Sequence, residues 1–95
     1  MKNGLIELSH FALFTFATTS QALKAEKVLQ AIQAEFLVIP TLREISASCG
    51  LSIKFRLEDG LQFYDLLLNN KIQIDGIYQV QKNQGSYSLK ELEKF

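Results

Sequence analysis

The stretch His10-Phe-Ala-Leu-Phe-Thr-Phe16 decides the fold, because it is rich in aromatic residues and is apolar at almost every position after His10, with Thr15 as the exception. A strand with one buried face alternates apolar and polar residues, whereas a strand covered on both faces does not. The stretch therefore predicts the central strand of a sheet, with other parts of the chain packed on both of its faces.

A helix is predicted directly after this strand. Thr18 and Gln21 have the Ser/Thr-x-x-Glu/Gln spacing of a capping box, in which two side chains satisfy free amide groups at a helix N-terminus. The apolar residues that follow share one face at helical spacing: Ala22, Ala25, Val28, Leu29 and Ile32. The two small alanines would let this helix lie close to the sheet.

The same criteria predict the rest of the chain. The further elements are an edge strand over 36–39, an alternating strand over 51–57, a helix between Glu58-Asp59-Gly60 and Asn69-Asn70, and a last strand over 74–81 with a bulge at Gly76. Pro40 ends the edge strand, since proline cannot donate a hydrogen bond to a ladder. Residues 83–85 predict a turn, and the spacing of Ser88 and Glu91 predicts a second capping box ahead of a short C-terminal helix.

The order strand, helix, strand, strand, helix, strand predicts an α+β fold, a ferredoxin-like βαββαβ two-layer sandwich with an antiparallel four-stranded sheet and an added short C-terminal helix. We expect one domain over 1–95, with its core over about 10–81, a lead-in segment over 1–9 and the C-terminal turn and helix over 83–95. In this interpretation the first and third strands are parallel neighbours. The lead-in segment, the C-terminal helix or a second copy of the chain covers the sheet face away from the helices, and a homodimer through that face is the preferred interpretation.

The composition argues against several classes of function. Ten Lys and Arg balance ten Asp and Glu, which leaves no basic field for nucleic acid. The longest apolar run, Phe11 to Ala17, is far shorter than the ~20 residues that a membrane helix needs. One cysteine and one histidine do not supply the ligands of a structural metal site, and we expect no cofactor. A single cysteine forms no internal disulfide, which favours the cytoplasm.

The only proline and the only cysteine lie in the segment Pro40-Thr-Leu-Arg-Glu-Ile-Ser-Ala-Ser-Cys-Gly50. Cys49 is the one candidate nucleophile in the sequence. A free cysteine is usually a buried, inert apolar residue, and that alternative stays open here. A reactive role is favoured by Gly50, which lets a partner backbone approach, and by Arg43, since a guanidinium beside a thiol favours the thiolate.

Two further expectations depend on how the strands pair. Parallel first and third strands would place His10 at the same edge of the sheet as Cys49, within reach of the thiol, although a histidine at a strand end is more often simply solvated. That edge would also carry the C-terminal ends of both main helices, which disfavour a thiolate. Activation would then depend on Arg43 or on an amide group of the loop.

Four stretches of the sequence carry a family resemblance over about residues 12–80. They are Phe14-Thr-Phe16, Gln21–Leu29, Ile39–Leu51 and Gly76-Ile-Tyr78, and the most specific part is Arg43-Glu-Ile-Ser46 followed by Ser48-Cys-Gly50. With these residues the chain resembles the Se/S carrier protein-like family, short bacterial proteins long grouped as a domain of unknown function. Leu42 departs from the proline that the family often has before the arginine.

The resemblance implies that Cys49 carries sulfur or selenium as a persulfide or selenosulfide, in a site shaped by Arg43, Ser46, Ser48 and Gly50. It implies a cysteine desulfurase-type donor and an acceptor protein as partners, and a carrier or transferase-like relay protein rather than a turnover enzyme. A lone cysteine suits a carrier, because no second thiol can expel the cargo by forming a disulfide. The alternative is a non-catalytic ferredoxin-like module that binds a small molecule or a protein and has a structural cysteine.

Overall fold

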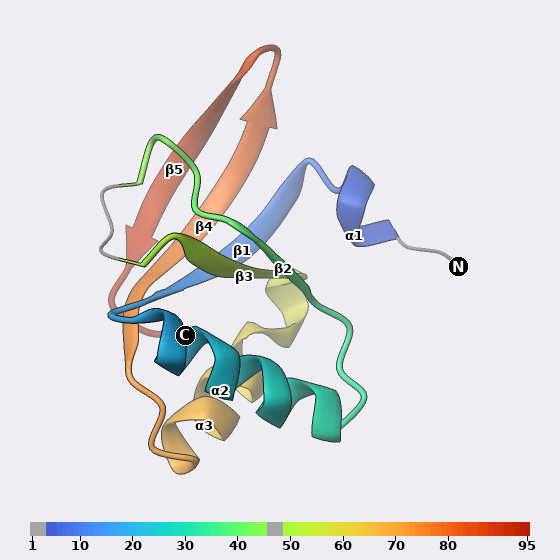
Figure 1. The fold of residues 1–95 in the computed structure, drawn as a ribbon. Coiled ribbons are helices and arrows are strands. Elements are labelled where there is room, and N and C mark those ends of the chain that lie inside the picture. Colours follow the sequence, from blue (N-terminus) through green and yellow to red (C-terminus); the bar gives the residue numbers. More distant parts are fainter. Residues whose placement is uncertain (1–3, 46–48) are drawn as a thin grey trace.

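The structure, a computed structural model, describes residues 4–45 and 49–95, which form an α+β fold with an antiparallel sheet and two helices on one of its faces (Figure 1). The elements are α1 (Gly4–Glu7), β1 (His10–Phe16), α2 (Thr19–Ala31), β2 (Leu37–Pro40), β3 (Leu51–Phe55), a 3-10 turn η1 (Leu57–Asp59), α3 (Gly60–Asn69), β4 (Ile74–Asn83) and β5 (Ser86–Leu92). The strand order is β2-β3-β1-β4-β5. β1 is therefore the central strand, as predicted.

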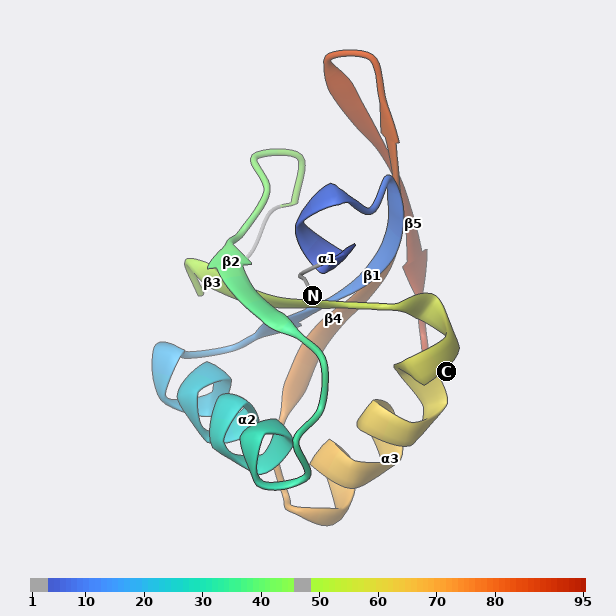
Figure 2. The same ribbon diagram turned by 90° about the vertical axis from the view of Figure 1, so that its right-hand side faces the viewer.

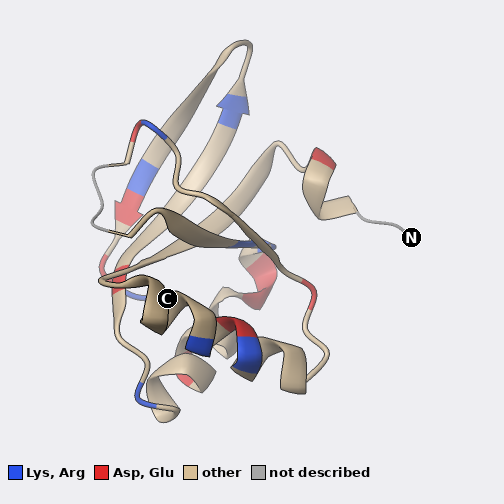
Figure 3. Ribbon diagram, viewed as in Figure 1, with Lys and Arg blue, Asp and Glu red and all other residues tan. Residues whose placement is uncertain are grey.

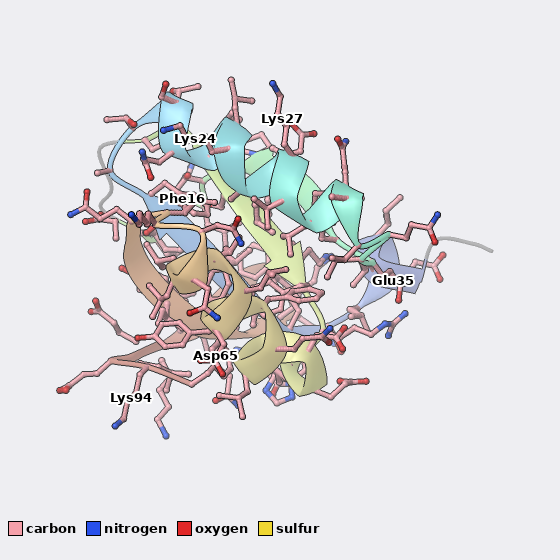
Figure 4. All side chains as sticks on the ribbon, turned by 90° about the horizontal axis from the view of Figure 1, so that it is seen from below. Phe16, Lys24, Lys27, Glu35, Asp65 and Lys94 are labelled. Carbon is pink, nitrogen blue, oxygen red and sulfur yellow. The ribbon has the colours of Figure 1, made fainter. Side chains whose placement is uncertain are left out.

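The two faces of β1 explain its apolar composition. Phe14 and Phe16 face α2 and α3, while Phe11 and Leu13 belong to a second apolar cluster on the other face of the sheet. Every residue of β1 after His10 is buried. In Figure 4, Phe16 points into the molecule from β1, whereas Lys24 and Lys27 point outward from α2. Figure 2 shows α2 and α3 side by side below the sheet.

The α2 cap forms in part as predicted. Thr18 is the N-cap, and its Oγ1 accepts a hydrogen bond of 3.2 Å from the backbone N–H of Gln21. The Gln21 side chain does not return to Thr18. Its Oε1 instead accepts from the backbone N–H of Gln73, 2.9 Å away, and so links the start of α2 to the segment before β4.

The predicted C-terminal helix is wrong, and the structure has a fifth strand there. The turn over 83–85 is present, with Gly85 at φ +78°, and it leads into β5. Tyr87 and Leu89 alternate with polar residues and pair with Lys82 and Val80 of β4. A long neighbouring strand with free backbone groups offers β5 a full ladder, which outweighs the local helix signal of Ser88 and Glu91.

The predicted parallel pairing of the first and third strands is also wrong. β1 and β3 are antiparallel, with Ala12 opposite Phe55 and Thr15 opposite Ser52. The chain returns from α2 so that β2 runs in the same direction as β1, and β3 pairs antiparallel with β2 while lying between the two. β3 must therefore run opposite to both, and this decides which side chains share an end of the sheet.

The sheet face away from the helices is covered within one chain. Its buried cluster contains Phe11, Leu13, Ile45 and Val80, and Leu8, from the lead-in segment, packs on it. Leu42 and Ile45 reach this face from the segment between β2 and β3. The lead-in segment, one of the three predicted alternatives, thus contributes to the cover together with the segment between β2 and β3, for which no such role was predicted.

The helix-side core ends in an aromatic cluster. The rings of Phe14 and Phe55 lie 4.5 Å apart, that of Phe63 lies 5.4 Å from Phe55, and the ring of Phe95 lies 6.0 Å from both Phe14 and Phe55. Phe95 also occupies the space beside Gly60, where an added Cβ would clash with its ring. Within the described ranges, no helix has the length and apolar character needed to span a membrane.

Candidate functional site

Cys49 lies immediately before β3, at the end of the sheet where β1 finishes and α2 begins. Thr15, near the end of β1, pairs with Ser52, and Thr19, the first residue of α2, contacts the cysteine sulfur. Figure 1 shows the starts of α2 and β3 at the same edge of the sheet. Segments that are far apart in the sequence therefore meet around the thiol.

The sulfur of Cys49 is buried. The residue is 3% exposed and belongs to the helix-side core cluster. Among the described residues, two polar groups lie beside Sγ: the backbone N–H of Leu51, which donates a hydrogen bond of 3.4 Å, and the Thr19 hydroxyl, whose oxygen is 4.0 Å away. Both can donate to a sulfur that carries negative charge.

The helix ends near Cys49 differ in part from the expectation. The sulfur lies beside Thr19, the N-terminal residue of α2, so the prediction is wrong for α2. It holds for α3, which ends at this edge of the sheet, because the N–H of Gln73, shortly after α3, donates to Gln21 at the start of α2. The error follows from the wrong strand direction, because antiparallel pairing with β1 brings the start of β3 to the end of β1. A helix N-terminus favours nearby negative charge and a helix C-terminus disfavours it, so the start of α2 differs in electrostatic effect from the end of this helix that was predicted there.

Thr41 holds the backbone that follows the thiol. Its N–H donates to the carbonyl of Gly50 at 2.9 Å, and its hydroxyl donates to the carbonyl of Cys49 at 3.0 Å. The same hydroxyl oxygen lies 2.8 Å from Oγ of Ser52, which is fully buried. We call the hydrogen bonds that join Thr41 to Cys49, Gly50 and Ser52 the Thr41 clasp.

The residues expected to shape the site are only partly brought together. Gly50 is exposed, and none of the described residues lies within 4 Å of a Cβ placed there. Arg43 is exposed, and no hydrogen bond or ion pair joins it to Cys49 among the described residues. Ser46 and Ser48 lie outside the described residues.

His10 is at the other end of the sheet from Cys49. It opens β1 and pairs with Gln81, whereas Cys49 precedes the strand that pairs with the far end of β1. Its Nε2 instead lies 3.0 Å from Nε2 of Gln79. The predicted contact between imidazole and thiol does not form, because it depended on parallel pairing.

The sequence did not single out Thr19, Thr41 or Ser52. Thr41 stands between a proline and Leu42, where a threonine has no distinctive spacing, and Ser52 and Thr19 meet the site only through tertiary contacts. A correct strand direction would have identified Thr19, because it places the start of the helix next to the start of β3. Nothing in the local pattern identifies the Thr41–Ser52 contact.

Two pockets open near the ends of β4 and β5. A pocket of about 450 Å³ lies between α3 and these strands and includes Tyr64, Gly76 and Leu92 in its lining. A second, of about 600 Å³, is lined by Glu44, Ile45, Asp75, Tyr78, Leu89 and Glu91. Cys49 lines neither pocket. Among the described residues, no group of His, Cys, Asp and Glu side chains could hold a metal ion.

Comparison with known proteins supports the family resemblance. A family described as Putative Se/S carrier protein-like matches residues 11–79, which include Cys49 and the elements from β1 to β4 that hold it. Comparisons with curated proteins and with solved structures found no match. Since the family match covers well over half of the 95 residues, the chain belongs to the Putative Se/S carrier protein-like family.

Proposed function

We propose that the protein carries sulfur or selenium on Cys49, as a persulfide or selenosulfide, between a donor and an acceptor protein. The observation that supports this most directly is the position of Sγ, beside the first residue of α2 and within 3.4 Å of the Leu51 N–H. A helix N-terminus and an amide donor both stabilise negative charge on sulfur. Cys49 is the only cysteine in the sequence, so a loaded sulfur meets no second thiol of the chain.

The loading reaction is a sulfur transfer between two thiols. The Cys49 thiolate attacks the terminal sulfur of a persulfide on the donor, and the S–S bond of the donor breaks. A new S–S bond forms on Cys49, and the electron pair leaves with the donor thiolate. A nucleophile of the acceptor then attacks the terminal atom on Cys49, which returns the Cys49 thiolate. Selenium in the terminal position follows the same balance.

The burial of Cys49 adds a requirement to this mechanism. A residue that is 3% exposed cannot meet a donor persulfide in its resting position, so the sulfur must become accessible for each transfer. The same burial would keep a loaded sulfur away from thiols in solution between transfers. We propose that sheltering and presentation alternate, and that contact with the partner accompanies presentation.

The partners are proposed to be a cysteine desulfurase-type donor and an acceptor protein, in the cytoplasm. The chain has equal numbers of acidic and basic residues, and Figure 3 shows the two signs interspersed over the elements. Long-range steering by one sign of charge is therefore weak, and docking depends on the shape of the surface.

The second candidate function is a binding module with a structural cysteine, and the burial of Cys49 favours it. A cysteine in a core cluster, hydrogen-bonded to a backbone N–H, is what a packed, inert residue looks like. The two candidates differ in whether the thiol takes up sulfur.

Mass spectrometry after incubation with a cysteine desulfurase and cysteine separates the candidates. The carrier function predicts a mass gain of one sulfur atom that dithiothreitol removes, and no gain in Cys49→Ser. A small alkylating reagent serves as the control for access to the thiol. If the reagent modifies Cys49 in the folded protein while the desulfurase adds no sulfur, or if neither reacts, the binding-module function is the better description.

The homodimer expected from the sequence remains a proposal, but its original reason is weaker. That reason was an uncovered apolar face, and Phe11, Leu13 and Val80 on this face are at most 2% exposed within a single chain. Light scattering decides the question by giving the mass of one chain or of two. A dimer that persists when Leu89 of this face is replaced by serine would use a different surface.

A further inference from the structure

Thr41 makes the contacts that hold Cys49 in its buried position. One residue supplies two hydrogen bonds to the backbone at the thiol and directly after it, to the carbonyls of Cys49 and Gly50. Both bonds come from the end of β2, whose Pro40 pairs with Leu51 at the start of β3. Cys49 is thus tied to an edge strand through Thr41, while its sulfur lies on the helix side of the sheet.

The direction of the hydrogen bonds follows from counting protons. The Thr41 hydroxyl has one hydrogen, which it donates to the carbonyl of Cys49 at 3.0 Å. The contact of 2.8 Å between the hydroxyls of Thr41 and Ser52 therefore has Ser52 as its donor. A chain of two hydrogen bonds runs from the buried Ser52 through Thr41 to the Cys49 backbone, and each bond polarises the next.

We infer that Thr41 is a positioning residue that sets how often the Cys49 sulfur becomes accessible. When the Thr41 hydroxyl releases the Cys49 carbonyl, Cys49 loses its side-chain tie to β2, and the exposed neighbour Gly50 has no side chain to obstruct a rearrangement. Apart from the N–H bond from Thr41 to Gly50, the clasp consists of side-chain hydroxyls and not of apolar packing. Local opening therefore breaks few contacts besides those of the Cys49 side chain in the helix-side core, and it leaves the rest of the fold intact. The significance of this opening for transfer rests on the proposed function, whereas the opening itself does not.

The test measures the rate at which iodoacetamide alkylates Cys49 in the folded protein. Thr41→Val keeps the shape and the backbone N–H but removes the hydroxyl, and we expect the rate to rise by roughly three- to tenfold, as loss of one buried hydrogen bond allows. Ser52→Ala removes only the donor to Thr41, so its rate should rise less. Thr41→Ser restores a hydroxyl and should return the rate toward that of the wild type.

A control separates local opening from general destabilisation. Phe63→Leu weakens the aromatic cluster near Phe55, at a distance along β3 from Cys49, and lowers global stability without touching the clasp. Rates are measured at increasing urea. Alkylation through local opening is insensitive to low urea, whereas alkylation through global unfolding rises with the slope of the unfolding transition. The inference predicts a high, urea-insensitive rate for Thr41→Val alone.

The inference is overturned if Thr41→Val alkylates at the wild-type rate, or if its rate follows global stability as that of Phe63→Leu does. Its failure is distinguishable from failure of the proposed function, because the alkylation assay contains no sulfur donor. A faster Thr41→Val that never gains sulfur from a desulfurase would leave the clasp standing and refute the carrier. If the protein gains sulfur normally but Thr41→Val alkylates at the wild-type rate, the carrier function stands and the clasp is refuted.

Discussion

Lys54 is a lysine within the central part of the sheet, 8% exposed, with its Nζ 4.2 Å from the centre of the Phe11 ring. The positive charge interacts favourably with the ring face, but burial removes it from water. Burial lowers the pKa of Lys54 below 10.5, and the charge of Lys82 lowers it further. The folded protein therefore releases this proton at a lower pH than the unfolded chain does.

This lowered pKa gives a pH-dependent prediction. Below the folded-state pKa both states bind the proton, and above 10.5 neither does. Between these limits the unfolded chain binds more protons, so the free energy of unfolding rises with pH. Urea unfolding at pH 7 and at pH 10 should show the wild type gaining stability relative to Lys54→Met at the higher pH. The prediction is contradicted if the difference in free energy of unfolding between the wild type and Lys54→Met is the same at pH 7 and at pH 10.

Gly76 is required by its neighbours. A Cβ at this position would lie 2.7 Å from Oγ1 of Thr15 and 2.7 Å from the ring of Tyr78. Since the buried Thr15 cannot move away, we expect Gly76→Ala to lower the free energy of unfolding by about 1–3 kcal/mol. Gly50→Ala is the matched control, because no atom of the described residues lies within 4 Å of its added Cβ. If the two variants lose the same free energy of unfolding, the loss comes from the reduced backbone freedom of alanine and not from crowding at Gly76.

At the scale of elements, the N-cap of α2 has two roles. Thr18 satisfies the N–H of Gln21, and it also holds the helix start beside Cys49, through the next residue, Thr19. Thr18→Ala should cost about 1 kcal/mol of stability by urea unfolding, while Thr18→Ser, which keeps an equally good capping hydroxyl, should leave the stability unchanged. A Thr18→Ala variant as stable as the wild type would indicate that tertiary contacts alone fix the start of α2.

The bulge near the start of β4 changes which face of the sheet the side chains of this strand point to. Phe16 pairs with Ile74 and Thr15 with Gly76, so Asp75 is the extra residue. Ile74 thereby packs in the helix-side core, although it has the same parity as Gly76 and Tyr78. The glycine in the sequence indicated a bulge to within one residue, because glycine in a strand often marks such a site.

The elements with strong internal patterns were predictable, and the order in which they pair was predictable only in part. β1, α2, β3 and α3 follow from apolar periodicity, and Pro40 ends β2 as expected. β5 was missed because Ser88 and Glu91 have a helix-capping spacing, and only the neighbouring β4 makes a strand more favourable. Strand direction depends on where the chain returns after α2, which no local pattern encodes.

For the molecule as a whole, the candidate nucleophile was predictable and its surroundings were not. Cys49 stands out in the sequence as a lone cysteine among small residues. Its neighbours come from segments 8 and 30 residues away, Thr41 and Thr19, and they meet only when β3 lies between β1 and β2. Arg43, the activator expected from proximity in sequence, is exposed instead. Proximity in sequence therefore did not predict which side chains contact Cys49, because the segment that holds it crosses the end of the sheet.

The sheltered sulfur has a consequence for exposure to air and peroxide. Oxidation of cysteine requires contact between the sulfur and the oxidant, and its rate follows exposure. With Cys49 3% exposed and no second cysteine in the chain, peroxide should form sulfenic acid slowly, and dimers linked by a disulfide should be rare on non-reducing gels. Loss of the Thr41 hydroxyl should speed both reactions together. Rapid peroxide oxidation of the untreated protein would mean that the thiol is open to solvent most of the time.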